Sequence, residues 1–172
     1  MTVDLGAMID QLAWFGEALP PVVRCAGEEG VRWKPDTRHW SIVEIVNHLA
    51  DEEVEDFRTR TFQTLEHPEE AWPPIDPEGV VIERKHQEKD LEESLERFVE
   101  LRKESVGMLR MLLNPQWDNA HEHPSIGTMR AGDVFASWVA HDALHLRQVA
   151  KRLYQLSEMR GDPYSVDYAG GW

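Results

Sequence analysis

Residues 41–65 read SIVEIVNHLADEEVEDFRTRTFQTL, and this stretch sets the class of fold. Ser41 followed three residues later by Glu44 is a capping-box pattern, which is typical of the first turn of a helix. Apolar residues then recur at the spacing of a helix with one buried face; they are Ile42, Ile45, Val46, Leu49, Phe57 and Phe62. Because His67-Pro68 ends the pattern, the stretch predicts an amphipathic helix from Ser41 to about Leu65.

Three other stretches show the same helical spacing of apolar residues, at about 4–19, 89–113 and 128–158. Pro20-Pro21 is expected to kink or end the first of them, because proline lacks the amide that a helix interior needs. Thr128 is the predicted N-cap of the last. We expect no strand between these helices.

Two long segments separate the later helices, at residues 68–80 and 115–127, and both are expected to be loops because they are rich in proline, glycine or polar residues. Long ordered loops are often functional. The sequence therefore predicts an all-α protein, a four-helix bundle with long loops between helices 2 and 3 and between helices 3 and 4.

The chain has 172 residues and is expected to form one domain over 1–172, with an irregular tail at about 161–172. It holds 32 acidic and 18 basic residues, a net charge of −14, which argues against binding to nucleic acid or to an anionic membrane surface. No apolar run approaches the length of a membrane-spanning helix.

A cytoplasmic location is expected for two reasons. The single cysteine, Cys25, allows no internal disulfide, as is usual in a reducing compartment. The first five residues, MTVDL, lack the basic and apolar regions of a signal peptide.

His141 and His145 lie four residues apart in the last predicted helix, so their rings project from one face, one turn apart. Trp138 and Val149 share that face, so the pair points inward. Two imidazoles at this spacing can chelate one metal ion. A zincin protease needs glutamate directly after the first histidine, and Asp142 stands there instead, which argues against a protease of that class.

His48 lies at the edge of the apolar stripe of the helix predicted over 41–65, and a facing helix could bring it against the His141/His145 pair. Three neutral imidazoles on one divalent ion leave a position open for water or substrate, which is the pattern of catalytic zinc. Glu52 or Asp51 could orient His48, accept a proton from bound water, or ligate directly. The alternative is that these histidines are hydrogen-bonded core residues.

Other combinations of chemical groups are weaker. His121 and His123 could hold a metal on a loop, although such loop residues are more often solvated. Glu83 and His86 have the E-x-x-H spacing of a di-iron bundle, but a second such pair is missing from the sequence. Cys25 is expected to be a packed free thiol.

Two sequence motifs contain the candidate histidines: residues 40–49 read WSIVEIVNHL and residues 141–148 read HDALHLRQ. They resemble the W-S-x-x-E-x-x-x-H-L and H-D-x-x-H-x-x-Q patterns of the DinB-like (DinB/YfiT) superfamily, and the resemblance covers about residues 4–158. It implies a four-helix bundle with a divalent-metal site built from one histidine of the second helix and two of the last. Carried over, these ligands are His48, His141 and His145.

Members of this family include transferases that use bacillithiol or mycothiol, and a mycothiol-dependent isomerase, and they are often homodimers. The resemblance therefore implies a small-molecule substrate, a divalent ion (zinc or nickel), a low-molecular-weight thiol as a possible cofactor, and a homodimer. The expected function is that of a metal-dependent enzyme, either a thiol-dependent S-transferase or a hydrolase. The alternative is a non-catalytic metal- or ligand-binding stress protein. Trp40, Trp138 and the segment 68–80 are candidates for the walls of a cleft. Packing in the core is the alternative for each, and it is the favoured one for Trp138.

Overall fold

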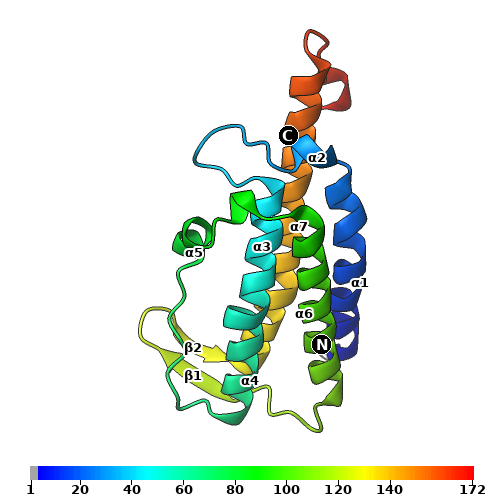
Figure 1. Ribbon diagram of the computed structural model, residues 1–172. Coiled ribbons are helices and arrows are strands. Elements are labelled where there is room, and N and C mark those ends of the chain that lie inside the picture. Colours follow the sequence, from blue (N-terminus) through cyan, green and yellow to red (C-terminus); the bar gives the residue numbers. More distant parts are fainter. Residues whose placement is uncertain (1–3) are drawn as a thin grey trace.

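The computed structural model describes residues 4–172 (Figure 1). Residues 1–3, which carry part of the expectation about a signal peptide, lie outside the described residues. Four long helical stretches form the bundle: α1 (Leu5–Arg24), a composite second helix from Ile42 to Glu66, α6 (Leu91–Met111) and α7 (Ala131–Gly161). Helices α1 and α3 each pack against both α6 and α7, and the buried apolar side chains between the helices form two clusters. The predicted four-helix bundle is confirmed.

The bundle has two pairs of parallel neighbours. In Figure 1, α1 and α7 run upward while the second helix and α6 run downward. Such an arrangement requires one long connection, between the second helix and α6, because these consecutive helices run in the same direction. Within residues 4–172, no helix combines the length and the apolar character needed to cross a membrane.

The second helix begins as the sequence predicts and then departs from a regular α-helix. Its capping box is present, because Ser41 N donates to Glu44 Oε2 at 2.7 Å and Glu44 N donates to Ser41 Oγ at 3.4 Å. Helix α3 (Ile42–Glu52) is followed by a π-helical turn, η1 (Glu53–Arg58), and by α4 (Thr59–Glu66). A π-helical turn of this kind is frequent near functional sites.

The π-helical turn changes which side chains share a face. At roughly 100° per residue, an uninterrupted α-helix would place Phe57 roughly opposite His48. One extra residue in the turn removes roughly 100° of that rotation. Phe57 instead faces α7, where its ring lies 4.8 Å from His141 and stacks on Trp138 at 6.2 Å. The turn therefore lets His48 and Phe57 approach the same part of α7.

Helix α1 continues past Pro20-Pro21 to Arg24, so the predicted end of the helix near residue 19 is wrong, whereas the sequence also allowed a helical continuation beyond the prolines. Leu19 and Val23, which flank the prolines, are fully buried in the core. Burial of both apolar side chains offsets the backbone hydrogen bonds that the prolines remove. A short helix, α2 (Gly27–Gly30), follows. Cys25 between them is exposed, which corrects the expectation of a packed thiol.

The segment expected as a loop over 68–80 is helical at its end. Helix α5 (Pro77–Glu83) begins with proline, and the carboxylate of Asp76 caps it by accepting from Gly79 N at 3.0 Å. Proline at the first helical position behind an aspartate cap is a favourable helix start. A short 3-10 turn, η2 (His86–Glu88), leads from α5 to α6.

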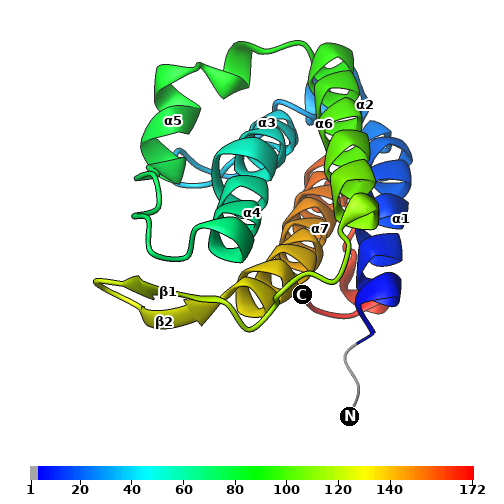
Figure 2. The ribbon, with the colours of Figure 1, turned by 90° about the horizontal axis from the view of Figure 1, so that it is seen from below.

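The segment expected as a loop over 115–127 contributes to a β-hairpin, which corrects the expectation that the chain has no strand. Strands β1 (Ala120–His123) and β2 (Gly127–Arg130) pair antiparallel, and the three-residue loop between them is followed by Gly127 at φ 79°. Glycine at positive φ is usual after such a loop. Figure 2 shows the hairpin and α5 on the side of the bundle away from α1.

Thr128 lies in β2, so its prediction as a helix N-cap is wrong. Helix α7 begins at Ala131, where the carboxylate of Asp133 accepts from Arg130 N at 3.1 Å and from the Arg130 guanidinium. The tail after α7 is irregular except for a 3-10 turn, η3 (Asp167–Ala169).

A buried ion-pair network crosses the centre of the bundle. The guanidinium of Arg102 on α6 donates to Glu53 in the π-helical turn, to Asp142 on α7 and to the carbonyl of Leu12 on α1. Arg102 is 2% exposed. Trp138 is 1% exposed and donates to Glu53 Oε2 at 3.1 Å, which confirms its expected place in the core. This network fixes α3, α6 and α7 relative to one another.

Candidate metal centre

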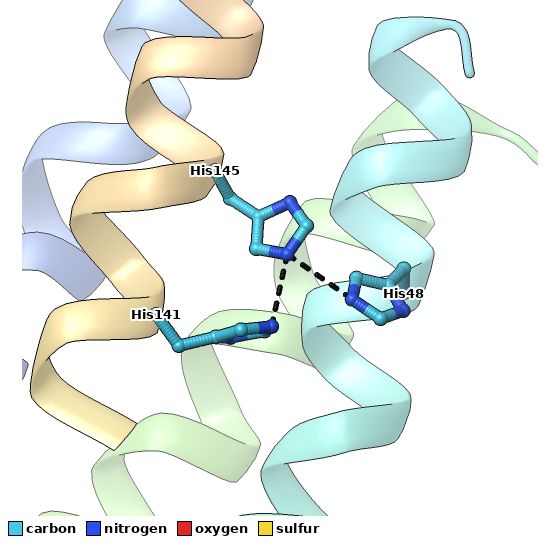
Figure 3. A group of neighbouring side chains, drawn as sticks. All are labelled: His48, His141 and His145. Carbon is cyan, nitrogen blue, oxygen red and sulfur yellow. Dashed lines mark hydrogen bonds between the residues drawn. The ribbon is translucent and has the colours of Figure 1, made fainter. Parts of the chain in front are cut away.

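Three histidine side chains converge between α3 and α7 (Figure 3). His145 Nε2 lies 2.9 Å from His141 Nε2 and 3.1 Å from His48 Nε2. One ligand atom from each of the three residues lies within 4.8 Å of the other two. The convergence that the sequence predicts is confirmed.

Local structure explains how the three rings meet. His141 and His145 are one turn apart on α7, so their imidazoles lie on the same face of that helix. His48 comes from the middle of α3, which packs against α7. His48 is buried, whereas the two histidines of α7 are half-buried. The group is thus enclosed on the α3 side and retains access to solvent on the other.

The three imidazoles have lowered pKa values and are neutral at pH 7. Burial, together with the neighbouring His145, lowers the pKa of His48 to about 3. Burial and the two other histidines lower the pKa of His141 to about 3. Burial also lowers the pKa of His145, although its hydrogen bond with Gln148 acts in the opposite direction. A neutral imidazole has a free lone pair, which is the form that binds a metal.

The spacing of the nitrogen atoms suits a divalent ion. In a tetrahedral zinc site, bonds of about 2.0–2.1 Å place two ligand nitrogens about 3.3–3.4 Å apart. The separations of 2.9 and 3.1 Å require the rings to move apart by only a few tenths of an ångström. Three imidazoles fill three of the four tetrahedral positions, so one remains for water or a substrate.

The groups behind the histidines orient the rings. Gln148 Oε1 lies 2.8 Å from His145 Nδ1. An amide oxygen accepts only, so the proton of the imidazole lies on Nδ1 and the lone pair on Nε2 points toward the other histidines. Gln148 has no assigned role in the sequence prediction, although its place three residues after His145 on the same helix is a readable signal.

Two aromatic rings enclose the group. The ring of Trp40 lies 4.7 Å from that of His48 and stacks parallel to His145 at 6.5 Å. Phe57 covers His141 from the other side. These apolar walls keep the histidines neutral by limiting solvation. Trp40 therefore lies against the three-histidine group, although it is not in the lining of the cavity beside His48.

The two carboxylates predicted near the histidines lie in different surroundings. Glu52 Oε1 is 4.0 Å from His48 Nδ1. Asp51 instead turns to three basic side chains, those of Arg84, His86 and Arg97, with contacts of 3.0, 3.0 and 2.6 Å. Among residues 4–172, the converging ligand atoms at this centre come from the histidines alone. Glu52 is therefore the nearer of the two carboxyl groups to His48.

The protonation of these two carboxyl groups also differs. Burial raises the pKa of Glu52 to about 8, and its hydrogen bond with Asp56 and the negative charge there act in the same direction. Burial also acts to raise the pKa of Asp51. The hydrogen bond from His86 and the charge of Arg97 outweigh burial and hold the pKa of Asp51 below its ordinary value. Glu52 can therefore hold a proton at neutral pH, whereas Asp51 remains ionised.

A cavity of about 240 Å³ opens beside His48. One wall is α3 and the start of the π-helical turn, and the other is the end of the segment expected as a cleft wall, residues 74–77 with Val80 of α5. Pro74, Ile75 and Pro77 make this second wall largely apolar. The cavity can therefore hold a small molecule next to His48.

The other candidate residues lie apart from this centre. His121 and His123 sit on β1 and pack against the ring of Trp72, with ring centroids 4.7 and 5.6 Å from it. His86, from the E-x-x-H pair, is buried against Asp51. A second converging group, His67, Glu69 and Glu70, is fully exposed on the loop after α4.

Comparisons with known proteins agree with this architecture. A family model described as the DinB superfamily matches residues 11–149, a range that contains His48, His141, His145 and Gln148. The solved structure of YfiT from Bacillus subtilis superposes with a TM-score of 0.78 and 20% sequence identity, covering 94% of this chain and 91% of that one. That protein is described as "a probable metal-dependent hydrolase with an unusual four-helix bundle topology". At this identity, the likeness establishes the fold. No curated protein matches the sequence.

Proposed function

Since this chain belongs to the DinB superfamily, we propose that it is a metal-dependent enzyme that acts on a small molecule at a centre formed by His48, His141 and His145. The observation that carries the proposal is the convergence of three neutral imidazole nitrogens beside a cavity. Zinc and nickel are the proposed ions, because imidazole ligands suit both.

When bound, a divalent ion with an open position polarises a substrate and lowers the pKa of a coordinated water or thiol. The chain's own residues supply the rest of the chemistry. Gln148 orients His145, while Trp40 and Phe57 exclude water from the rings. Glu52, 4.0 Å from His48 Nδ1, orients that ring or moves a proton beside it.

We propose two reaction classes for this centre, thiol-dependent S-transfer and hydrolysis. S-transfer would use a low-molecular-weight thiol as a second substrate. Hydrolysis is included because YfiT, a protein of similar structure, is described as a probable metal-dependent hydrolase; that description concerns YfiT itself. A cytoplasmic location, supported by the single cysteine, fits both classes.

Turnover separates these classes from the non-catalytic alternative. Zinc- or nickel-loaded protein would be incubated with small thiols and an aromatic halide electrophile, and separately with activated esters and amides. Product formation above the background reaction in one assay assigns the class. The variant His48→Ala is the control, because it removes a ligand, and it should show background rates only. Background rates for the parent in every assay would favour a non-catalytic binding protein.

Replacing Gln148 with leucine should weaken divalent-metal binding by about tenfold, because the hydrogen bond that fixes His145 is lost. Titration calorimetry with Zn²⁺ measures the effect. Gln148→Glu is the matched variant, because its carboxylate also accepts from His145 Nδ1, and it should bind at least as tightly as the parent. An equal loss in both variants would contradict the positioning role of Gln148.

A homodimer remains a prediction from the family resemblance. Light scattering at micromolar concentration should give a mass of about 40 kDa, twice the 19.9 kDa of one chain. A mass equal to that of a single chain would contradict it.

A further inference from the structure

The cavity beside His48 is lined by more carboxyl groups than guanidinium groups. Its lining includes the carboxyl groups of Asp51, Glu52, Glu55 and Asp76 but only one guanidinium, that of Arg84. Four carboxyl groups therefore face one guanidinium in the lining, and one of them, Asp51, is also paired with a second guanidinium, that of Arg97, outside the lining.

The guanidinium in the lining is already occupied. Arg84 donates to both carboxylate oxygens of Glu55, at 2.7 and 3.1 Å, and its Nη1 lies 3.0 Å from Asp51 Oδ2. An anionic group in the cavity would thus have to compete with two carboxylates for Arg84. We therefore expect the cavity to bind anionic groups weakly, because like charges placed close together are unfavourable.

Within the described part of the chain, two polar groups in the lining have no charged or hydrogen-bonding partner for part of their surface. Asp76 is exposed, caps α5 through a bond from Gly79 N, and has no ion-pair partner among residues 4–172. His86 is 1% exposed, and its Nδ1 has no hydrogen-bond partner among the same residues. Because His86 Nε2 lies 3.0 Å from Asp51 Oδ2, Nδ1 is the ring nitrogen left to contact a ligand. Asp76 and His86 are therefore both available to a polar group of a bound molecule.

We infer that the substrate carries a positively charged, hydrogen-bond-donating group, such as a primary ammonium, which binds on the Asp76 side of this cavity. The apolar wall of Pro74, Ile75 and Val80 would contact the body of the molecule. The reacting end would lie beside His48. The net charge of −14 favours the approach of such a ligand. This inference rests on the proposed function, because it assigns a substrate class to the same centre.

Three small thiols that differ in charge test the inference: 2-aminoethanethiol, 2-mercaptoethanol and mercaptoacetate. Each would be titrated into Co²⁺-loaded protein, because a thiolate bound to Co²⁺ gives an absorption band in the near ultraviolet. The measured quantity is the affinity for the cationic thiol divided by that for the neutral thiol. Comparing this ratio between variants cancels the different acidities of the free thiols.

The test variant is Asp76→Asn, which removes the charge but keeps an oxygen that can cap α5. Its affinity ratio should fall by about threefold relative to the parent, the effect of one unit charge at a solvated distance of several ångströms. The matched control is Glu78→Gln, which makes the same charge change on α5 at a residue outside this cavity's lining. Its ratio should equal that of the parent.

The outcomes separate the inference from the function on which it rests. A ratio unchanged by Asp76→Asn, or lowered equally by Glu78→Gln, would overturn the inference while the thiolate band upheld the open metal position. Tighter binding of mercaptoacetate after Asp76→Asn, with weaker binding of 2-aminoethanethiol, would support the inference. Absence of cobalt binding would overturn the proposed function and the inference with it.

Discussion

Replacing His145 with alanine is expected to weaken divalent-metal binding by at least about tenfold. The loss of a residue that only hydrogen-bonds to a metal ligand already costs about this much, and His145 is proposed to be a ligand itself. His145 is the central residue of the group, because its Nε2 is within 3.1 Å of both other Nε2 atoms. The double variant His141→Ala/His145→Ala leaves His48 as the last imidazole of the centre and should show no measurable binding. Titration calorimetry with Zn²⁺ and Ni²⁺ measures both effects.

A matched control separates loss of a ligand from loss of any histidine. His123→Ala removes an imidazole that packs against Trp72 on the hairpin, away from α3 and α7. Its metal affinity should equal that of the parent. Circular dichroism would verify that the variants keep their helices. Unchanged affinity in folded His145→Ala protein would remove this residue from the ligand set.

Replacing Arg102 with methionine is expected to lower the free energy of unfolding by about 3–5 kcal/mol, because it leaves buried carboxylates without their partner. Glu53 and Asp142 both pair with this guanidinium and are almost fully buried. Even with Arg102 present, burial raises the pKa of Asp142 to about 6. Urea denaturation measures the loss, which is a large part of the stability of a typical domain.

The pH dependence of this loss distinguishes charge burial from lost packing. Without Arg102, the pKa of Asp142 rises further in the folded state, because the guanidinium that now lowers it is gone. A raised folded-state pKa contributes stability that is present at low pH and lost as the pH rises. The deficit should therefore be larger at pH 8 than at pH 5. The triple variant Arg102→Met/Glu53→Gln/Asp142→Asn should recover much of the loss, and an equal deficit at both pH values would contradict this explanation.

The features that the sequence predicts well are local ones. The Ser41–Glu44 capping box and the His141/His145 spacing each depend on a single turn of helix, and both appear as predicted. Helix α5 and the hairpin had readable signals in Asp76-Pro77 and in Gly127, but proline-rich and polar residues made both segments resemble loops. In both segments, residues that start a helix or a hairpin stand among residues that favour a loop, and this explains why the sequence predicted loops.

Other features depend on tertiary contacts that a periodic pattern does not contain. The π-helical turn is stabilised where Glu53 meets Arg102 and Trp138, which come from two other helices. The approach of His48 to the α7 pair likewise requires the packing of α3 on α7, and only the family resemblance indicated it in advance. The continuation of α1 through Pro20-Pro21 also depends on tertiary contacts, because burial of the flanking side chains outweighs the low helix propensity of proline.

The central claim is that His48, His141 and His145 together hold one divalent ion. Metal content, measured by plasma mass spectrometry on untagged protein reconstituted with Zn²⁺ or Ni²⁺ and freed of excess ion, tests it most directly. We expect about one ion per chain in the parent and none in His141→Ala/His145→Ala. Parent protein without metal after reconstitution, or a double variant that retains the full complement, would contradict the claim.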